Sequence, residues 1–138
     1  MRILIDTNVL IDFMMGRAPH FENADKIIKM CAKHKVQGAI AAHSIPNIFY
    51  ILRKDLPEQE RRAVLLSLCT ILTVEGIDSA KLITALKNSE FSDLEDCLQS
   101  ECAKKVRADY IVTRNLKDFT TSEVRAVSPE KFLEIVGN

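Results

Sequence analysis

The chain has 138 residues, of which 47% are hydrophobic and 28% are charged, as in an ordinary globular domain. A domain of this length buries about two-thirds of the surface that its unfolded chain exposes, so we expect a single domain over residues 1–138. The 19 basic and 19 acidic side chains balance. This balance argues against a general nucleic-acid binder, which is usually basic, and requires any such contact to come from a local patch or a bridging metal.

The amino-terminal run is apolar but short, and it lacks the positive charges and the longer apolar core of a secretory signal. The other apolar stretches are too short to span a bilayer. The four cysteines show no C-x-x-C spacing and only three histidines accompany them, which favours core thiols in a reducing compartment over a zinc site. We therefore expect a cytoplasmic protein that does not contact membranes.

Short β-rich runs alternate with longer helical stretches, a pattern that is typical of βαβ units around a parallel sheet. In chain order we expect a strand at 2–6, helices at 7–14 and 21–35, a strand at 37–42, helices at 44–53 and 57–69, a strand at 71–74, helices at 78–87 and 92–107, strands at 110–113 and 124–127, and a helix at 129–136. The predicted fold is a three-layer α/β/α sandwich with a central, mostly parallel five-stranded sheet.

The sequence contains no motif for a glycine-rich phosphate loop or for a serine or cysteine nucleophile. The chain has only four glycines, and none of them forms a glycine-rich phosphate loop after a predicted strand. It also lacks a G-x-S-x-G elbow and a strand-end cysteine beside a histidine. The acidic residues are what remain to carry chemistry.

Three acid-bearing segments, far apart in the sequence, lie where strands give way to helices. They are Arg2-Ile3-Leu4-Ile5-Asp6-Thr7-Asn8, the segment 92–96, and the segment 110–119. Ligands of an open α/β sheet bind beyond the carboxyl ends of its strands, so we expect Asp6 and the polar residues from Thr113 to Asp118 to converge there. Carboxylates gathered in one crevice repel each other unless a hard divalent cation lies between them. The pattern therefore predicts a site for Mg²⁺ or Mn²⁺.

Taken together, these segments closely resemble PIN domains, the metal-dependent ribonuclease fold of VapC-like toxins, from Met1 to about Phe132. The resemblance implies a divalent-metal-dependent endoribonuclease that hydrolyses RNA phosphodiesters, and it suggests the toxin of a toxin-antitoxin pair with an antitoxin protein as its partner. PIN domains of this kind commonly form homodimers. We therefore expect a two-fold dimer that uses the helices after the second strand, at 45–52 and 63–72.

Asp6 is the strongest single candidate for a metal ligand. The residues alone leave two interpretations open, because an aspartate before Thr7, Asn8 and an apolar run is also a good helix N-cap. The resemblance favours the metal role. Thr7 and Asn8 then become supporting groups that orient the carboxylate.

The segment 92–96 also has two interpretations. Ser92 and Glu95 match the S-x-x-E capping box, and acids in a first turn are favoured by the helix dipole. Asp93 and Asp96, however, lie three residues apart and can act together on one metal. Asp96 matches an acid of the PIN pattern, so we predict Asp6, Asp96 and Asp93 as catalytic residues and metal ligands, and we assign Glu95 to the cap.

Two positions depart from the PIN pattern, because amides stand where acids are usual. Asn115 follows Thr113 and Arg114, and Asn47 lies early in the helix after the second strand. Asn115 still offers a neutral oxygen to a metal, and Asp118 can supply the missing carboxylate, so both join the predicted ligands. Asn47 and Thr113 are predicted as supporting residues. A site with fewer carboxylates binds a hard cation less strongly.

Basic side chains near these segments are candidates for holding the RNA backbone, namely Arg114, Arg53 and Lys54. Two other functions stay open. The amides at 47 and 115 favour a catalytically weak PIN-like module that binds RNA or a protein partner. A phosphotransfer domain with Asp6 as nucleophile ranks last, because Asn8 stands where such a domain needs a second acid.

Overall fold

The computed structural model describes residues 1–137. Its strands are β1 (Arg2–Ile5), β2 (Gln37–Ala41), β3 (Thr73–Glu75), β4 (Tyr110–Val112) and β5 (Ala126–Val127). Its helices are α1 (Thr7–Met15), α2 (Phe21–Ala32), α3 (Ser44–Ile51), α4 (Glu58–Ile71), α5 (Ser79–Lys87), α6 (Leu94–Lys105), the short 3-10 helix η1 (Leu116–Phe119) and α7 (Pro129–Val136).

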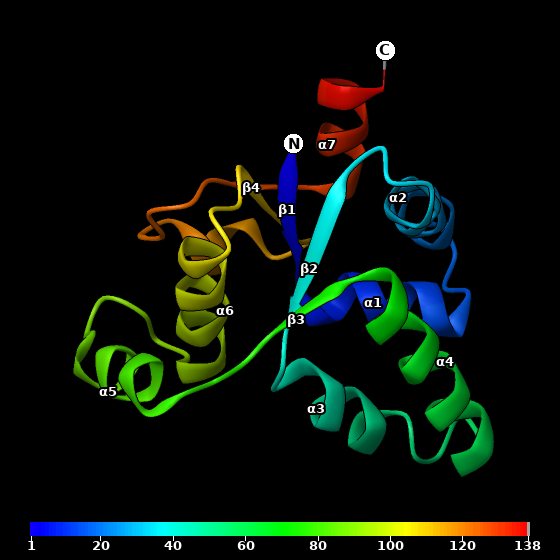
Figure 1. Ribbon diagram of the computed structural model, residues 1–138, viewed down its shortest axis with the longest axis horizontal. Helices are drawn as coiled ribbons and strands as arrows, with labels where there is room; N and C mark the ends of the chain where they lie inside the picture. The colour runs from blue at the N-terminus through cyan, green and yellow to red at the C-terminus, as the bar shows by residue number, and fades with distance from the viewer. Residues whose placement is uncertain (138) are drawn as a thin grey trace.

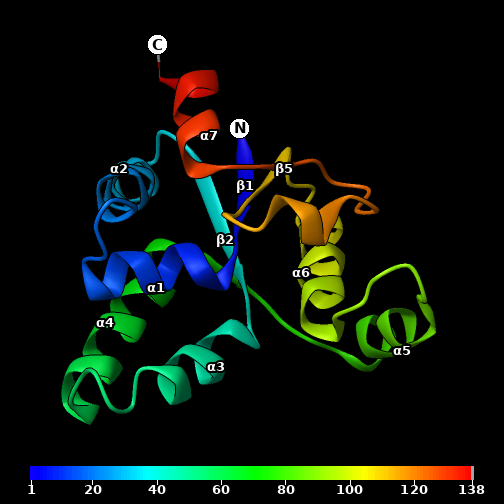
Figure 2. The ribbon, with the colours of Figure 1, turned by 180° about the vertical axis from the view of Figure 1, so that it is seen from behind.

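The five strands form one sheet in the order β3-β2-β1-β4-β5, and every neighbouring pair is parallel. Helices α5 and α6 cover one face of the sheet, and α1 to α4 with α7 lie on the other (Figure 1). The view from behind shows the same division (Figure 2). This arrangement confirms the predicted three-layer α/β/α sandwich, with β1 at its centre.

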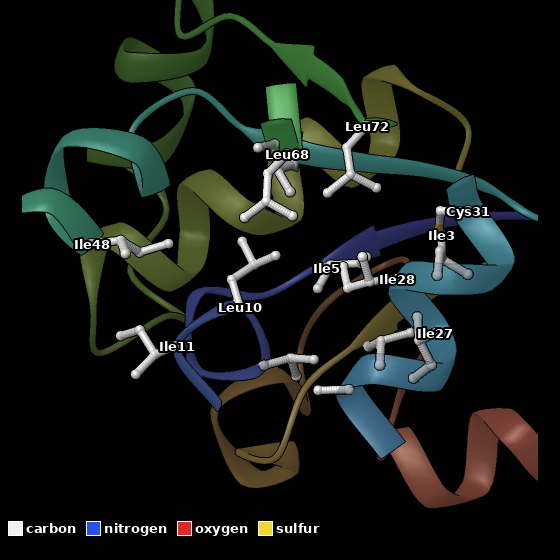
Figure 3. Packing of buried hydrophobic residues seen from close by; sticks show 14 of the residues in the cluster. Ile3, Ile5, Leu10, Ile11, Ile27, Ile28, Cys31, Ile48, Leu68 and Leu72 are labelled. Carbon is white, nitrogen blue, oxygen red and sulfur yellow. The ribbon is translucent and has the colours of Figure 1, made fainter. Parts of the chain in front are cut away.

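The side chains of the central strand β1 point alternately to the two faces of the sheet, which explains why helices pack on both faces. Ile3 and Ile5 point into the core beneath α1, α2 and α4, where Leu10, Ile27 and Leu68 meet them (Figure 3). The intervening Leu4 belongs to a second core on the α6 side of the sheet. A strand whose two faces are both covered must be apolar at every position, and the run Ile3-Leu4-Ile5 is completely buried.

Several element boundaries differ from the prediction by a few residues, and local structure explains two of these differences. Helix α2 ends at Ala32 and not at residue 35, because His34 adopts a left-handed φ of 60° and its amide donates to the Cys31 carbonyl oxygen at 3.0 Å. Helix α4 continues to Ile71, so β3 begins later than residue 71, at Thr73. The apolar run at the end of α4 suits either a strand or a buried helix end, so its periodicity alone does not decide between them.

Gly38 allows β2 to pass close to the helices of the larger core. A Cβ atom at this position would lie 2.6 Å from both the Cys31 sulfur and the Leu72 Cδ2 atom. A larger residue would have to displace the buried side chains of Cys31 and Leu72. None of the helices within residues 1–137 combines the length and apolar character that a bilayer crossing requires.

Candidate functional site

Asp6 lies at the carboxyl end of the central strand, beside the end of β4. Ile5 pairs with Val112, so the next residues, Asp6 and Thr113, are neighbours at the same edge of the sheet. The Thr113 hydroxyl donates to Asp6 Oδ2 at 2.8 Å, and the Thr7 amide donates to Oδ1 at 2.8 Å. Asp6 is therefore the N-cap of α1 and a sheet-edge carboxylate at once, because each oxygen serves a different neighbour.

Asn8 completes the set of donors around Asp6. Its Nδ2 atom lies 3.2 Å from Asp6 Oδ2 and 3.3 Å from the Thr113 hydroxyl. Asp6 is only 5% exposed, so these donors fix the orientation of its carboxylate in place of water. Thr7, Asn8 and Thr113 thus lie where supporting residues were predicted.

A cavity of about 180 Å³ opens beside Asp6, and Asp96 of α6 lines it from the other layer. The cavity brings together residues from α1, α6 and the segment after β4, although they are far apart in the sequence. Its lining residues are Asp6, Thr7, Asn8, Ile11, Glu95, Asp96, Gln99 and Asn115. The predicted convergence of Asp6, Asp96 and Asn115 is therefore present in the structure.

The acids around the cavity act on each other electrostatically. Burial, together with the negative charges of Asp93, Asp6, Asp118 and Glu95, raises the pKa of Asp96 from 3.8 to about 7. No single neighbour produces this shift. A carboxyl whose pKa is raised by burial and like charges is typical of a functional site that gathers acids for a cation.

Burial also raises the pKa of Asp6, and the charges of Asp118 and Asp93 add to the effect. The hydrogen bonds from Thr113 and Thr7 act in the opposite direction, because they stabilise the ionised carboxylate. The donors around Asp6 therefore keep a buried acid closer to its charged form.

The capping-box prediction for the start of α6 is wrong. Asp93 is the N-cap, and its Oδ1 atom accepts a hydrogen bond from the Asp96 amide at 3.0 Å. Helix α6 therefore begins at Leu94, and Glu95 is free to line the cavity with Asp96. Asp93 acts on the site through its charge, since the cap holds one of its oxygens and it does not line the cavity itself.

The remaining predicted residues divide into those at the cavity and those away from it. Asn115 lines the cavity, and its amide donates to the Thr113 hydroxyl at 3.0 Å. Asp118 lies in η1 outside the lining, where its charge still raises the pKa values of Asp6 and Asp96. Asn47 lies in α3 and does not line the cavity.

Sequence reasoning missed the buried residues Gln99 and Ser44, which form a hydrogen-bond triangle with the half-buried Thr7. The Gln99 amide donates to the Ser44 hydroxyl at 2.9 Å and to the Thr7 hydroxyl at 3.2 Å, and the two hydroxyl oxygens are 3.0 Å apart. Three helices meet through this triangle at the cavity wall. Gln99 lies one turn after Asp96 on the same face of α6, a spacing that could have revealed it.

The predicted RNA contacts have different surroundings. Arg114 makes a forked ion pair with the buried Asp12 of α1, with 3.1 Å between Nη2 and Oδ1. No sequence pattern predicted this pairing. Arg53 and Lys54 are exposed after α3, and the Arg53 guanidinium lies 3.9 Å from the centre of the Tyr50 ring.

The donor set at the cavity fits a hard, hydrated cation. Within residues 1–137, no three His, Cys, Asp or Glu side chains are grouped closely enough to hold a metal by themselves. Mg²⁺ usually keeps several waters and binds through one or two carboxylates. Asp6 and Asp96, with the neutral oxygen of Asn115, meet that requirement, whereas a site made only of protein ligands is not supported.

Comparison with known proteins gives the family. The PIN domain family model matches residues 2–117. A toxin-antitoxin complex from Klebsiella pneumoniae contains a chain that is 27% identical, with a TM-score of 0.68 over 92% of this chain and 97% of that chain. No curated protein matches.

Two other solved structures share the fold at lower identity. VapBC2 from Rickettsia felis, bound to a DNA fragment from its promoter, is 17% identical, with a TM-score of 0.66 over 93% of this chain and 98% of that chain. FitAcB from Neisseria gonorrhoeae is 16% identical, with a TM-score of 0.65 over 93% of this chain and 98% of that chain. Because the family model covers most of the sequence and the fold agrees, the chain belongs to the PIN domain family, as its acid-bearing segments predicted.

Proposed function

We propose that this protein is a divalent-metal-dependent endoribonuclease that hydrolyses RNA phosphodiesters. The observation that carries the proposal is the cavity where Asp6 and Asp96 meet, because burial there, together with the charges of neighbouring acids, raises the pKa of Asp96 to about 7. Such repulsion lowers the stability of the protein and is relieved by a cation. Membership of the PIN domain family supports the same chemistry.

Asp6 and Asp96 would hold Mg²⁺ or Mn²⁺, with the Asn115 side-chain oxygen as a neutral ligand and Asp93 and Asp118 contributing negative charge. The bound ion would lower the pKa of a coordinated water and polarise the scissile phosphate. The protein's own contribution is positioning. Thr113, Asn8 and the Thr7 amide hold the Asp6 carboxylate, and the triangle around Gln99 holds the cavity wall.

A catalytically weak module that binds RNA or protein is the second candidate. The amide of Asn115 at the cavity favours it, since the protein then brings only two of the predicted ligand carboxylates, Asp6 and Asp96, to the lining. A site with less charge holds a hard cation less tightly. If the site did not retain the cation at the metal concentrations of the cell, the protein would bind RNA without cleaving it.

We propose further that the protein is a cytoplasmic toxin with an antitoxin partner, and that residues 1–138 act as one domain. Support comes from the Klebsiella pneumoniae structure, which is a toxin-antitoxin complex. The RNA backbone would contact Arg53 and Lys54, which are exposed beyond α3. The exposed Tyr50 ring beside them is suited to stack on a base.

A homodimer through α3 and α4 is proposed from their apolar outer surface. A groove of about 530 Å³ between these helices is lined by Ile45, Pro46, Phe49, Arg62, Leu65, Leu66 and Cys69. Leu66, one of these lining residues, is 69% exposed. Contiguous apolar surface of this kind is typical of protein-protein interfaces.

Cleavage of a labelled RNA by the full chain, with Mn²⁺, Mg²⁺ or EDTA, tests the enzyme. We expect cleavage that EDTA stops and that Asp6→Asn and Asp96→Asn each abolish. Asp55→Asn, an exposed acid after α3, is the matched control and should cleave normally. Cleavage that survives EDTA and both site variants would refute the proposal, and RNA binding without cleavage would favour the second candidate.

Sedimentation equilibrium tests the dimer independently of activity. The proposal expects a species of twice 15.6 kDa that Leu66→Glu converts to a monomer. Leu86→Glu is a matched control, because Leu86 is also 69% exposed but lies in α5 on the opposite face of the sheet. A parent protein that sediments only at 15.6 kDa would remove the dimer.

A further inference from the structure

Asp12 is a buried charge that the proposed chemistry does not use. It lies in α1 with an exposure of 1%, and it is not among the residues that line the cavity. The Arg114 guanidinium binds both of its oxygens, through Nε to Oδ2 and through Nη2 to Oδ1. A buried carboxylate is stable only when it is paired in this way, and the forked geometry of arginine supplies both bonds from one side chain.

The ion pair is linked to Asp6 through the covalent frame of Arg114 and a chain of hydrogen bonds that starts at its backbone amide. The Arg114 amide donates to Asn8 Oδ1 at 3.2 Å. The other end of the Asn8 side chain donates to Asp6 at 3.2 Å and to the Thr113 hydroxyl at 3.3 Å. The Thr113 hydroxyl in turn donates to Asp6 and accepts from the Asn115 amide.

We propose that Asp12 and Arg114 are positioning residues of the candidate metal site. Their ion pair holds the segment from Thr113 to Asn115 against α1, so that Thr113 and Asn8 keep the Asp6 carboxylate in the cavity that it shares with Asp96. The inference rests on the proposed function for its metal. It assigns to Arg114 a role within the protein in place of contact with an RNA phosphate.

The backbone attaches the start of this segment to the sheet, whereas the Arg114 and Asn115 amides donate to side chains. The Thr113 amide donates to the Val127 carbonyl oxygen at 3.0 Å, so the end of β4 stays attached to β5 without the ion pair. The Asn8 side chain, however, meets the segment through the Arg114 amide, which directly precedes Asn115. Loss of the ion pair is therefore expected to disturb the Asp6 donors without unfolding the sheet.

Asp12→Asn separates positioning from RNA contact, because the two roles predict opposite results. Asp12 is buried and cannot touch RNA, and its removal frees the Arg114 guanidinium. If Arg114 holds a phosphate, the substitution leaves RNA binding unchanged or strengthens it, and Mn²⁺ binding does not respond. If the ion pair positions Asp6, the substitution weakens Mn²⁺ binding in the absence of RNA.

The experiment is calorimetric titration of the full chain with Mn²⁺, without RNA. We expect Asp12→Asn and Arg114→Gln each to weaken Mn²⁺ binding by about tenfold, the lower end of what loss of residues supporting a metal ligand causes. The double variant should bind Mn²⁺ no more weakly than the weaker-binding single variant, because both substitutions break the same ion pair. Asp25→Asn, which breaks the surface pair with Lys29 on α2, is the control and should bind normally.

Nuclear magnetic resonance of the metal-free protein provides a second measurement. Asp12→Asn should shift the signals of the Asn8 side-chain amide and the Thr7 backbone amide, and Arg114→Lys should shift them too, since lysine keeps the charge but not the fork. Unshifted signals, or unaltered Mn²⁺ binding by Asp12→Asn when the parent binds Mn²⁺, would overturn the inference. A parent that binds no Mn²⁺ refutes the proposed function, and the Asn8 and Thr7 signals then decide the positioning role alone.

Discussion

Replacing Asp96 by asparagine is expected to stabilise the metal-free protein at alkaline pH. Burial and the charges of Asp93, Asp6 and Asp118 raise the pKa of Asp96 from 3.8 to about 7. The folded state therefore binds this proton more tightly than the unfolded state does, and stability contributed by the protonated carboxyl is lost as the pH rises from 3.8 to about 7. An asparagine side chain carries no charge, so the substitution removes the free-energy cost of holding an ionised Asp96 in the folded protein.

The size of the effect follows from the shift. A shift of about three pKa units corresponds to about 4 kcal/mol at the rate of 1.36 kcal/mol per unit. Asp96 is partly exposed, so screening by solvent reduces this figure, and we expect about 1–2 kcal/mol above pH 7. For a chain of this length that gain raises the melting temperature by about 3–10 °C.

Thermal unfolding in EDTA, at about pH 4 and about pH 8, measures the difference between Asp96→Asn and the parent. The gain in stability of Asp96→Asn over the parent should be small at the lower pH and should reach its full size at the higher pH. Added Mn²⁺ should stabilise the parent at the higher pH and leave Asp96→Asn little changed, because the variant has lost a ligand. Asp55→Asn, an exposed acid, should follow the parent in every condition.

A loss of stability in Asp96→Asn at alkaline pH would refute the reasoning. If Asp96 were only a first-turn acid that interacts with the dipole of α6, its removal would destabilise the helix by about 0.3–1 kcal/mol. The dipole interpretation and the repulsion interpretation thus predict opposite signs. The sign of the change in melting temperature therefore decides between them.

Three further predictions concern the donors and amides of the site. Asp6→Asn should weaken Mn²⁺ binding in calorimetry yet change the free energy of unfolding by under about 1 kcal/mol, because asparagine caps α1 nearly as well. Thr113→Val should cost about 1–3 kcal/mol in urea unfolding and raise the pKa of Asp6 further, so that Mn²⁺ binding moves to higher pH. Asn115→Asp should tighten Mn²⁺ binding, whereas Asn47→Glu should not, and equal effects of the two would contradict the cavity lining.

The fold was predictable because local sequence patterns and the global packing agree. The run Ile3-Leu4-Ile5 has to be buried on both faces, and only a central parallel strand provides that environment. Element ends were less predictable, since they depend on single backbone conformations such as the left-handed His34. A histidine in the sequence does not predict a left-handed conformation, whereas a glycine would favour one.

The site was predictable only where its residues follow strands or open helices. Asp6 and Asp96 met that condition. The pairs Asp12–Arg114 and Thr7–Gln99 are separated by 102 and 92 positions in the sequence, and no local rule connects them. Asp12 in particular looks like an ordinary polar residue of α1, because nothing nearby in the sequence shows that Arg114 will reach it.

Helix ends explain how the protein gathers these carboxylates at all. Asp6 caps α1 and Asp93 caps α6, so each contributes charge to the site while it accepts a backbone hydrogen bond. The positive ends of the two helices offset part of the repulsion. They do not offset all of it, since burial and the charges of Asp93, Asp6, Asp118 and Glu95 still hold the pKa of Asp96 at about 7. The negative charge that is left is what a divalent cation between Asp6 and Asp96 would neutralise, so that Asp6 would serve both as a helix cap and as a ligand of the proposed metal site, while the cap residue Asp93 would add only its charge.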